Sequence, residues 1–196
     1  VDASQLELRL LAHYMQDKDY IYEITKGDIH SYNQKLAGLK SRDEAKVFIY
    51  ALCYGAGNQK IGTIVGGNAK RGGQLRERFF GSNPAFATLN QQVQRAARKG
   101  YLKGLDGRKL FVRSEHASLN TLLQGAGAIL MKKALTILNN RLHLSGTPHK
   151  FVANIHDEWQ IEVSECRANK VGQLAVESIR EAGEYFNLRC PMDGEY

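Results

Sequence analysis

The sequence has 196 residues, which is enough for one large domain or two small ones. With 43% hydrophobic and 24% charged residues it has the composition of an ordinary globular protein, and no apolar run approaches the roughly 20 residues that predict a membrane span. The formal charge of +7 and the pI of about 9.3 favour a polyanionic partner such as nucleic acid, although many basic proteins bind none.

Helical patterns dominate the first hundred residues. Residues 4–17 predict a first helix, and residues 41–55 a second, because Ser41 and Glu44 form a capping box and Gly55 is a suitable stop. The stretch "GAGNQKIGTIVGG" that follows is interpreted as a turn, since it lacks the G-x-x-x-x-G-K-[ST] pattern of a phosphate loop and does not follow a strand. Residues 66–100 predict two helices separated at Pro84.

The second half alternates between strands and helices. Asp106-Gly107 between two strand-like runs predicts a hairpin, residues 118–142 predict a long helix, and residues 166–186 a last amphipathic helix. Strand signals cluster at the two ends of the chain. We therefore expect an α+β protein whose sheet is built from both termini, with a mostly helical insertion between them. The three cysteines, an odd number without metal-ligand spacing, predict buried thiols.

The stretch "NIHDEWQIEV" at residues 154–163 places acids among apolar residues. At period two, Asp157 shares a strand face with Trp159, where its carboxylate would be desolvated. A hairpin turn through His156, Asp157 and Glu158 with solvated acids is the alternative. The sequence leaves both interpretations open.

A metal site would explain a buried carboxylate at Asp157. Clustered carboxylates have raised pKa values unless a cation lies among them, and Mg²⁺ usually takes one or two protein carboxylates together with substrate phosphates. Asp2 is the best candidate for a second carboxylate, because it follows the strand-like Val1 and precedes a helix. It is equally suited to be a helix-flanking acid.

The helix predicted after Ser41 carries a row of side chains at four-residue spacing. Arg42, Lys46, Tyr50 and Tyr54 lie nearly above one another, and two cations followed by two aromatic rings suit a nucleoside triphosphate. His30, upstream in "GDIHSYNQ", could add a phosphate contact. An ordinary amphipathic helix with solvated cations and packed tyrosines explains the same pattern.

The long helix combines amides with small residues. Asn120 and Gln124 are four residues apart beside the small-residue patch "GAGA", and amide donors suit the base-edge acceptors of a DNA minor groove. Close helix packing through Gly125 and Gly127 is the alternative. Arg113, just before this helix, could contact phosphate or simply face solvent.

Together these segments resemble the family A (Pol I-type) DNA polymerases, and most of all the replicative enzymes of short-tailed bacteriophages. "DASQLELR" resembles the first catalytic motif of the family, and "RDEAKVFIYALCYGAG" resembles its fingers-helix motif. "GLDGRKLFVRSEHASLNTLLQGAGA" is similar to the segment that joins fingers to palm, and "IHDEWQIEV" to the second catalytic motif. Four motifs in the family's order make the resemblance specific, and it covers essentially the whole chain.

The resemblance implies a role for each matching residue. It makes Asp2 and Asp157 the carboxylate ligands of two Mg²⁺ ions, with the Ala3 carbonyl as a backbone ligand and Glu158 as a supporting acid. For the incoming nucleotide it implies sugar contacts from Glu7 and Tyr50, triphosphate contacts from Arg42, Lys46 and His30, and a place for Tyr54 near the templating base, with Lys46 also the acid for pyrophosphate departure. The primer–template contacts that it implies are Arg113, Asn120, Gln124 and His156.

The resemblance also implies a right-hand polymerase fragment. An antiparallel palm sheet built from both ends would comprise residues 1–16 and 116–196, and mostly helical fingers would comprise residues 17–115. The thumb, the exonuclease and the N-terminal palm of the family are not matched, so we expect the chain alone to extend primers poorly or not at all.

The implied activity is template-dependent addition of dNTPs to a primer 3′-hydroxyl in phage DNA replication. It would take place in the cytoplasm of an infected bacterial host or of a bacterium, on primer–template DNA, with room for a processivity factor and with no membrane. A single-subunit RNA polymerase-like enzyme, a non-catalytic nucleic-acid-binding module and a helical protein without a nucleic-acid role are the alternatives.

Overall fold

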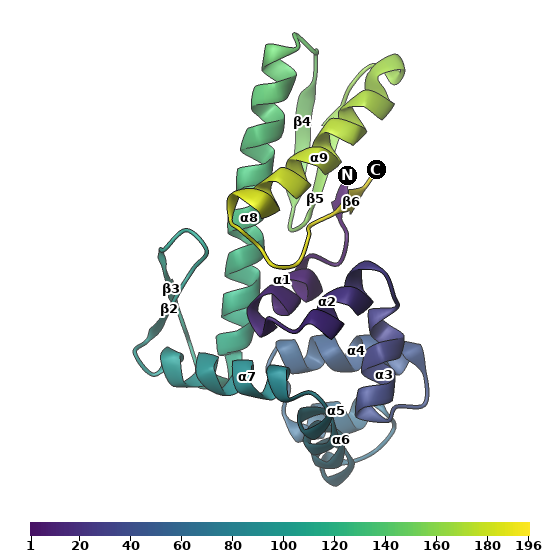
Figure 1. Ribbon diagram of the computed structural model, residues 1–196, viewed down its shortest axis with the longest axis vertical. Helices are drawn as coiled ribbons and strands as arrows, with labels where there is room; N and C mark the ends of the chain where they lie inside the picture. Colours follow the sequence, from purple (N-terminus) through teal and green to yellow (C-terminus); the bar gives the residue numbers. More distant parts are fainter. The chain divides into compact units, whose positions relative to one another are not determined.

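The computed structural model describes all 196 residues, and they form two compact units. The first unit comprises residues 1–13, 104–108 and 123–196, and the second comprises residues 14–103 and 109–122. The chain is mostly helical with a small antiparallel sheet, so the predicted α+β class is confirmed (Figure 1).

The sheet of the first unit is made by strands from both ends of the chain. Its order is β4-β5-β1-β6, and each neighbouring pair is antiparallel, which confirms the sheet expected from the sequence. Trp159 on β5 and Ala3 on β1 are almost fully buried. The elements are β1 (Asp2–Ala3), α1 (Leu6–Met15), α8 (Ser118–Leu144), β4 (Lys150–Ile155), β5 (Glu158–Glu162), η2 (Glu165–Arg167), α9 (Ala168–Tyr185) and β6 (Gly194–Glu195).

Helix α9 packs one face into the first unit. Val171, Ala175, Ile179 and Ala182 are buried at helical spacing, as the sequence predicts. Gly194 of β6 lies against this helix, since a Cβ there would meet the Ile179 side chain at 3.0 Å. The C-terminal strand is thereby held beside β1.

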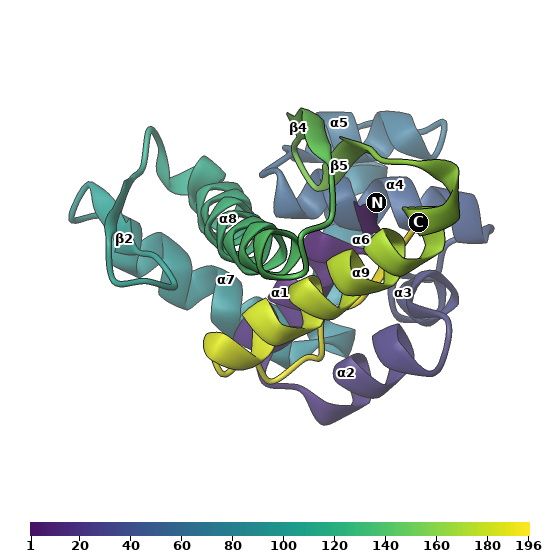
Figure 2. The same ribbon diagram turned by 90° about the horizontal axis from the view of Figure 1, so that it is seen from above.

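Helix α8 is 27 residues long, and Figure 2 looks along its axis. Residues 115–144 are long and apolar enough to cross a membrane by length and composition, which the sequence analysis did not anticipate. Half of the apolar window is buried inside the protein, and a core helix passes the same test, so this is weak evidence for a membrane. Gly127 packs against α1, where a Cβ would lie 3.1 Å from the Leu6 side chain. The close-packing interpretation of the small-residue patch is therefore correct at Gly127.

The second unit is a helical array with a short hairpin. Every helix of this unit except α5 begins at a side-chain cap, and Ser41 accepts a hydrogen bond from the Glu44 amide as the capping box predicts. Phe48, Phe79 and Phe86 form edge-to-face contacts in its core. The elements are α2 (Lys18–Thr25), α3 (Ile29–Ala37), α4 (Arg42–Cys53), α5 (Asn58–Ile64), α6 (Ala69–Ser82), α7 (Pro84–Ala97), β2 (Tyr101–Lys103), β3 (Lys109–Phe111) and η1 (Glu115–Ala117).

Two predictions about local structure are wrong, and one of the two interpretations left open for Asp157 is correct. The stretch interpreted as a turn contains helix α5, and Gly55 and Gly66, both with positive φ, bracket it. Of the interpretations for Asp157, the hairpin turn is correct: Asp157 follows His156, with φ of 54°, in the two-residue turn between β4 and β5. Cys166 is exposed, whereas the other two cysteines are buried as expected.

Candidate active site

The turn between β4 and β5 brings Asp157 beside Asp2. The Asp157 carbonyl accepts a hydrogen bond of 3.0 Å from the Ala3 amide, and Asp2 is paired with Glu158 across β1 and β5. On the other side of β1, Asp2 is paired with Glu195 of β6. Residues 155 positions apart in the sequence thus become neighbours because the first and the later strands share one sheet.

The charges in this group act on Asp2. Partial desolvation within the sheet raises the pKa of its carboxyl, although the side chain is exposed overall, and the charges of Asp157, Glu195 and Glu158 raise it further. The amino group of Val1 acts in the opposite direction. An acid held among like charges is a favourable place for a cation.

The donor set fits a hard divalent cation. No group of three or more His, Cys, Asp and Glu side chains is arranged as a closed metal site. Mg²⁺ does not need one, because it is usually bound by one or two carboxylates and completes its octahedron with water and substrate phosphates. Asp2 on β1 and Asp157 in the adjacent β4–β5 turn are two carboxylates of the kind that such an open site requires.

Glu7 on α1 is the second acidic centre of the first unit. Its side chain is buried, with 7% of the residue exposed, and its carboxylate accepts a hydrogen bond from Gln124 of α8. The Nε2 atom of His156 lies 3.5 Å from the same carboxylate. Three of the residues selected from the sequence therefore form one polar cluster, held by α1, α8 and the β4–β5 turn.

The second unit contains the residues that were selected from the sequence as triphosphate contacts, Arg42, Lys46 and His30. Arg42 at the start of α4 donates from Nε to Asp28 at 2.7 Å, and Asp28 is the N-cap of α3. This pairing and the Ser31 hydroxyl lower the pKa of Asp28. The bond uses one of the five N–H donors of the guanidinium, and the other four remain to bind an anion.

His30 lies next to this row. Only 5% of the residue is exposed, and its Nδ1 atom is buried without a hydrogen-bond partner. Burial lowers its pKa, and the charges of Arg42 and Lys46 lower it further, so the imidazole is neutral at pH 7.

The aromatic half of the row continues along α4. The His30 and Tyr50 rings are 6.5 Å apart, and the Tyr50 and Tyr54 rings 6.3 Å apart. The single face predicted from four-residue spacing is therefore present, with His30 beside it.

The predicted DNA-contacting residues differ in their surroundings. Arg113 is exposed after β3. Asn120 on α8 is half-buried, and its Oδ1 atom is buried without a hydrogen-bond partner. Gln124 and His156 belong to the Glu7 cluster described above.

Two carboxylates that lie beside Arg42 and Asp2, those of Asp28 and Glu195, were not predicted from the sequence. Asp28 looks like an ordinary helix cap, and its pairing with Arg42 across 14 residues has no periodic signal. Glu195 lies in a two-residue strand, which is too short to show alternation.

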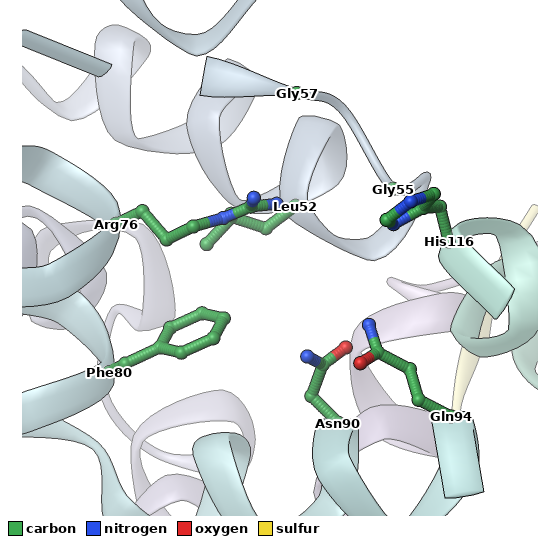
Figure 3. Close-up of a pocket in the computed structure, with 8 residues that line it drawn as sticks. All are labelled: Leu52, Gly55, Gly57, Arg76, Phe80, Asn90, Gln94 and His116. Atoms are coloured by element: carbon green, nitrogen blue, oxygen red, sulfur yellow. The ribbon is translucent and has the colours of Figure 1, made fainter. Parts of the chain in front are cut away.

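A cavity of about 530 Å³ in the second unit was also not predicted (Figure 3). Arg76 and Phe80 of α6 point into it from one side, Asn90 and Gln94 of α7 from another, and His116 lies near Gly55 at its edge. Arg76 donates to the Ala56 carbonyl at 2.9 Å.

Comparison with known proteins identifies relatives over the whole chain. The family model for DNA polymerase family A matches residues 1–196. The DNA-directed DNA polymerase of Escherichia phage T7 is 40% identical over 223 aligned positions, and that of Enterobacteria phage T3 is 41% identical. DNA polymerase I of Aquifex aeolicus is 30% identical.

The chain covers a part of each of these relatives. All of this chain corresponds to 31% of each phage enzyme, and 99% of it to 37% of the Aquifex enzyme, so it spans about a third of their length. A solved structure described as the POL domain of Pol1 from M. smegmatis in complex with DNA primer-template and dNTP has a TM-score of 0.86 and 25% identity, covering 98% of this chain and 37% of that one. The chain belongs to DNA polymerase family A.

Proposed function

We propose that the chain is part of a DNA-directed DNA polymerase that adds dNTPs to a primer 3′-hydroxyl under the direction of a template. The observation that carries the proposal is the pairing of Asp2 with the β4–β5 turn, which sets two aspartates from distant parts of the chain side by side. Family membership and the DNA and dNTP in the M. smegmatis complex support this assignment.

The two structural units suggest how the chain is divided. We propose that residues 1–16 and 116–196 belong to the palm and residues 17–115 to the fingers. In the structure, the boundaries between the two units lie after His13 and after Leu122, and the tip of the β2–β3 hairpin at residues 104–108 is assigned to the first unit. Asp2, Asp157 and Glu158 lie in the first unit, which contains the four-stranded sheet. Arg42, Lys46, Tyr50 and Tyr54 lie in the second unit, which is called the helical unit below.

Asp2, Asp157 and the Ala3 carbonyl would hold two Mg²⁺ ions, with Glu158 alongside them. When bound, such a metal pair lowers the pKa of the attacking hydroxyl and neutralises charge on the leaving group. Without metal, desolvation and then the neighbouring negative charges raise the pKa of Asp2.

In the helical unit, the triphosphate is proposed to bind to Arg42, Lys46 and His30. Asp28 fixes the guanidinium of Arg42 through Nε and so orients its remaining donors. Neutral His30 would donate one hydrogen bond without adding charge. Lys46, exposed on α4, is the proposed acid that protonates the departing pyrophosphate.

Residues on both units complete the proposed substrate contacts. Glu7 is proposed to lie under the incoming sugar, where its buried carboxylate, together with Tyr50, would exclude a 2′-hydroxyl. Tyr54 would lie near the templating base. Arg113, Asn120, Gln124 and His156 are the proposed primer–template contacts, and amide donors would read the minor groove without selecting sequence.

The setting follows from the phage and bacterial relatives. We propose a role in phage DNA replication, in the cytoplasm of an infected bacterial host or of a bacterium. The proposed partners within the same polymerase are a thumb, an exonuclease and the N-terminal palm, and a processivity factor could join them.

The proposal is tested by Asp157→Asn in the polymerase that carries this chain. Single-nucleotide incorporation should fall by at least about 1,000-fold, because the loss of one carboxylate leaves the metal site incomplete, while affinity for primer–template DNA is retained. Glu162→Gln is the matched control, since Glu162 is exposed on the same hairpin and faces Lys150. Unchanged incorporation by Asp157→Asn would refute the proposal in favour of a non-catalytic binding module.

A further inference from the structure

The positive charge of the chain is concentrated in one segment. Residues 95–113 contain seven of the 27 Lys and Arg residues and one of the 20 acidic residues, so they carry +6 of the formal charge of +7. The one acid, Asp106, is paired with Arg108. All seven cations are exposed: Arg95, Arg98, Lys99, Lys103, Arg108, Lys109 and Arg113.

The β2–β3 hairpin, whose backbone is drawn in Figure 1, forms residues 101–111 of this segment, and its pairing places the strand side chains on two opposite faces. Leu102 is paired with Leu110, and Leu102 is buried. Because side chains alternate along a strand, the pairs on either side of it project to the opposite face. That face carries Tyr101 opposite Phe111 and Lys103 opposite Lys109, and we call these four residues the hairpin face.

The hairpin face is unfavourable for folding. Like charges directly opposite each other on a two-stranded ribbon repel, and Lys103 and Lys109 occupy such a pair. Phe111 is 77% exposed, which forgoes the stabilisation of a buried aromatic ring. The Nζ atom of Lys109 lies 4.7 Å from the centroid of the Tyr101 ring, and this cation–π contact offsets part of the unfavourable free energy. A ligand that neutralises the lysines and covers Phe111 would remove both penalties.

We propose that the hairpin face binds single-stranded DNA. The two lysines would contact successive phosphates, and the exposed Phe111 ring would stack on a base, a combination that holds unpaired strands without sequence preference. An acidic protein segment would also satisfy the lysines, but a single-stranded nucleic acid carries a planar base with every phosphate. The inference rests on the proposed function in one respect, since a polymerase supplies an unpaired template strand as the ligand.

The proposed phosphate contacts of Lys103 and Lys109 are tested with the double variant Lys103→Gln/Lys109→Gln in the polymerase that carries this chain. Binding of labelled oligo(dT) is measured over a salt series. The slope of log K against log salt should become shallower by about 1.4, because each phosphate contact on a single strand contributes about 0.7. The control Lys35→Gln/Lys170→Gln removes two exposed lysines elsewhere and should leave the slope unchanged.

The proposed stacking of the Phe111 ring on a base is tested with the variants Phe111→Leu and Phe111→Tyr. Loss of the ring in Phe111→Leu should weaken oligo(dT) binding by about 5-fold to 150-fold at an unchanged salt slope, and Phe111→Tyr should restore binding. Since Phe111 is largely exposed, neither variant removes core packing.

Two results would overturn the proposal. One is an equal loss of oligo(dT) affinity in the control pair. The other is equal or tighter binding of a poly-glutamate peptide that does not depend on the ring at residue 111, which would assign the hairpin face to an acidic protein partner. Incorporation on a primer–template with a one-nucleotide overhang separates this test from that of the proposed function, because hairpin variants should retain it and Asp157→Asn should lose it.

Discussion

At the scale of a residue, the proposed metal ligand Asp2 has surroundings that disfavour its ionised form. Its pKa in the folded protein is raised, first by desolvation and then by three neighbouring acids. The folded state therefore holds this proton more tightly than the unfolded state does. The resulting stabilisation is present below the unfolded pKa of 3.8 and is lost as the pH rises through the raised folded pKa. At pH 7 without metal, the ionised Asp2 disfavours the fold.

Asp2→Asn should accordingly stabilise the metal-free protein at pH 7. We expect a gain below about 1 kcal/mol in the free energy of unfolding, because the side chain is exposed and its interactions are screened. Mg²⁺ should stabilise the wild-type protein more than the variant, since binding to the folded state adds to its stability. Thermal unfolding with EDTA and with Mg²⁺ measures both effects.

Glu162→Gln serves as the control in these scans. Glu162 is exposed and lies 3.5 Å from Lys150, away from the acids around Asp2, and its substitution should change neither the metal-free stability nor the response to Mg²⁺. A loss of metal-free stability in Asp2→Asn would contradict the account of charge repulsion at this site.

Individual site residues were predictable from the sequence where a local rule applied. Four-residue spacing on α4 was sufficient to predict the Arg42–Tyr54 row, because helix geometry fixes which side chains share a face. The choice between a strand face and a turn for Asp157 could not be made from the sequence, because alternation cannot reveal a two-residue turn that includes a left-handed residue at His156. The partners Asp28 and Glu195 depend on long-range packing, for which no local pattern exists.

At the scale of elements, α5 and α6 pack with their backbones in close contact. A Cβ on Gly72 would lie 1.9 Å from the Asn58 carbonyl oxygen, and one on Gly62 would lie 2.0 Å from the Asn68 carbonyl oxygen. These glycines allow two helix backbones to approach each other directly. Gly62 lies in the stretch that was interpreted from the sequence as a turn, because glycine is typical of both turns and close helix contacts.

Gly72→Ala should therefore destabilise the protein. We expect a loss of about 1–3 kcal/mol, because the added methyl group can be accommodated only if one helix moves away from the other. Gly81→Ala is the matched control on the same helix, since a Cβ there meets nothing within 4 Å, and it should stabilise by up to about 1 kcal/mol through helix propensity. Chemical denaturation of both variants measures the difference, and equal effects would contradict the packing argument.

Element boundaries were predicted best where caps and breakers coincide. The break at Pro84 is correct because Asn83 ends α6 and caps α7, and the Asp106-Gly107 turn is correct because Gly107 adopts a positive φ of 86°. The sheet order could not be predicted in detail, since β1 and β6 have two residues each and their pairing is decided by the whole fold.

At the scale of the whole molecule, the sheet joins the two ends of the chain. β1 lies between β5 and β6, so the N-terminal strand is held by two strands from the C-terminal third. Trp159 and Val1 exchange backbone hydrogen bonds of 2.8 and 3.0 Å, which anchor Asp2 although it is near the terminus. This closure brings Asp2 beside the β4–β5 turn that contains Asp157, as the proposed metal site requires.

The most direct measurement is anomalous diffraction from Mn²⁺ in crystals of the polymerase with primer–template and an incoming nucleotide. The account predicts an Mn²⁺ peak at about 2.1 Å from carboxylate oxygens of both Asp2 and Asp157, near the distance that Mg²⁺ prefers. An Mn²⁺ ion bound elsewhere, or bound to one aspartate while the other turns to solvent, would contradict it.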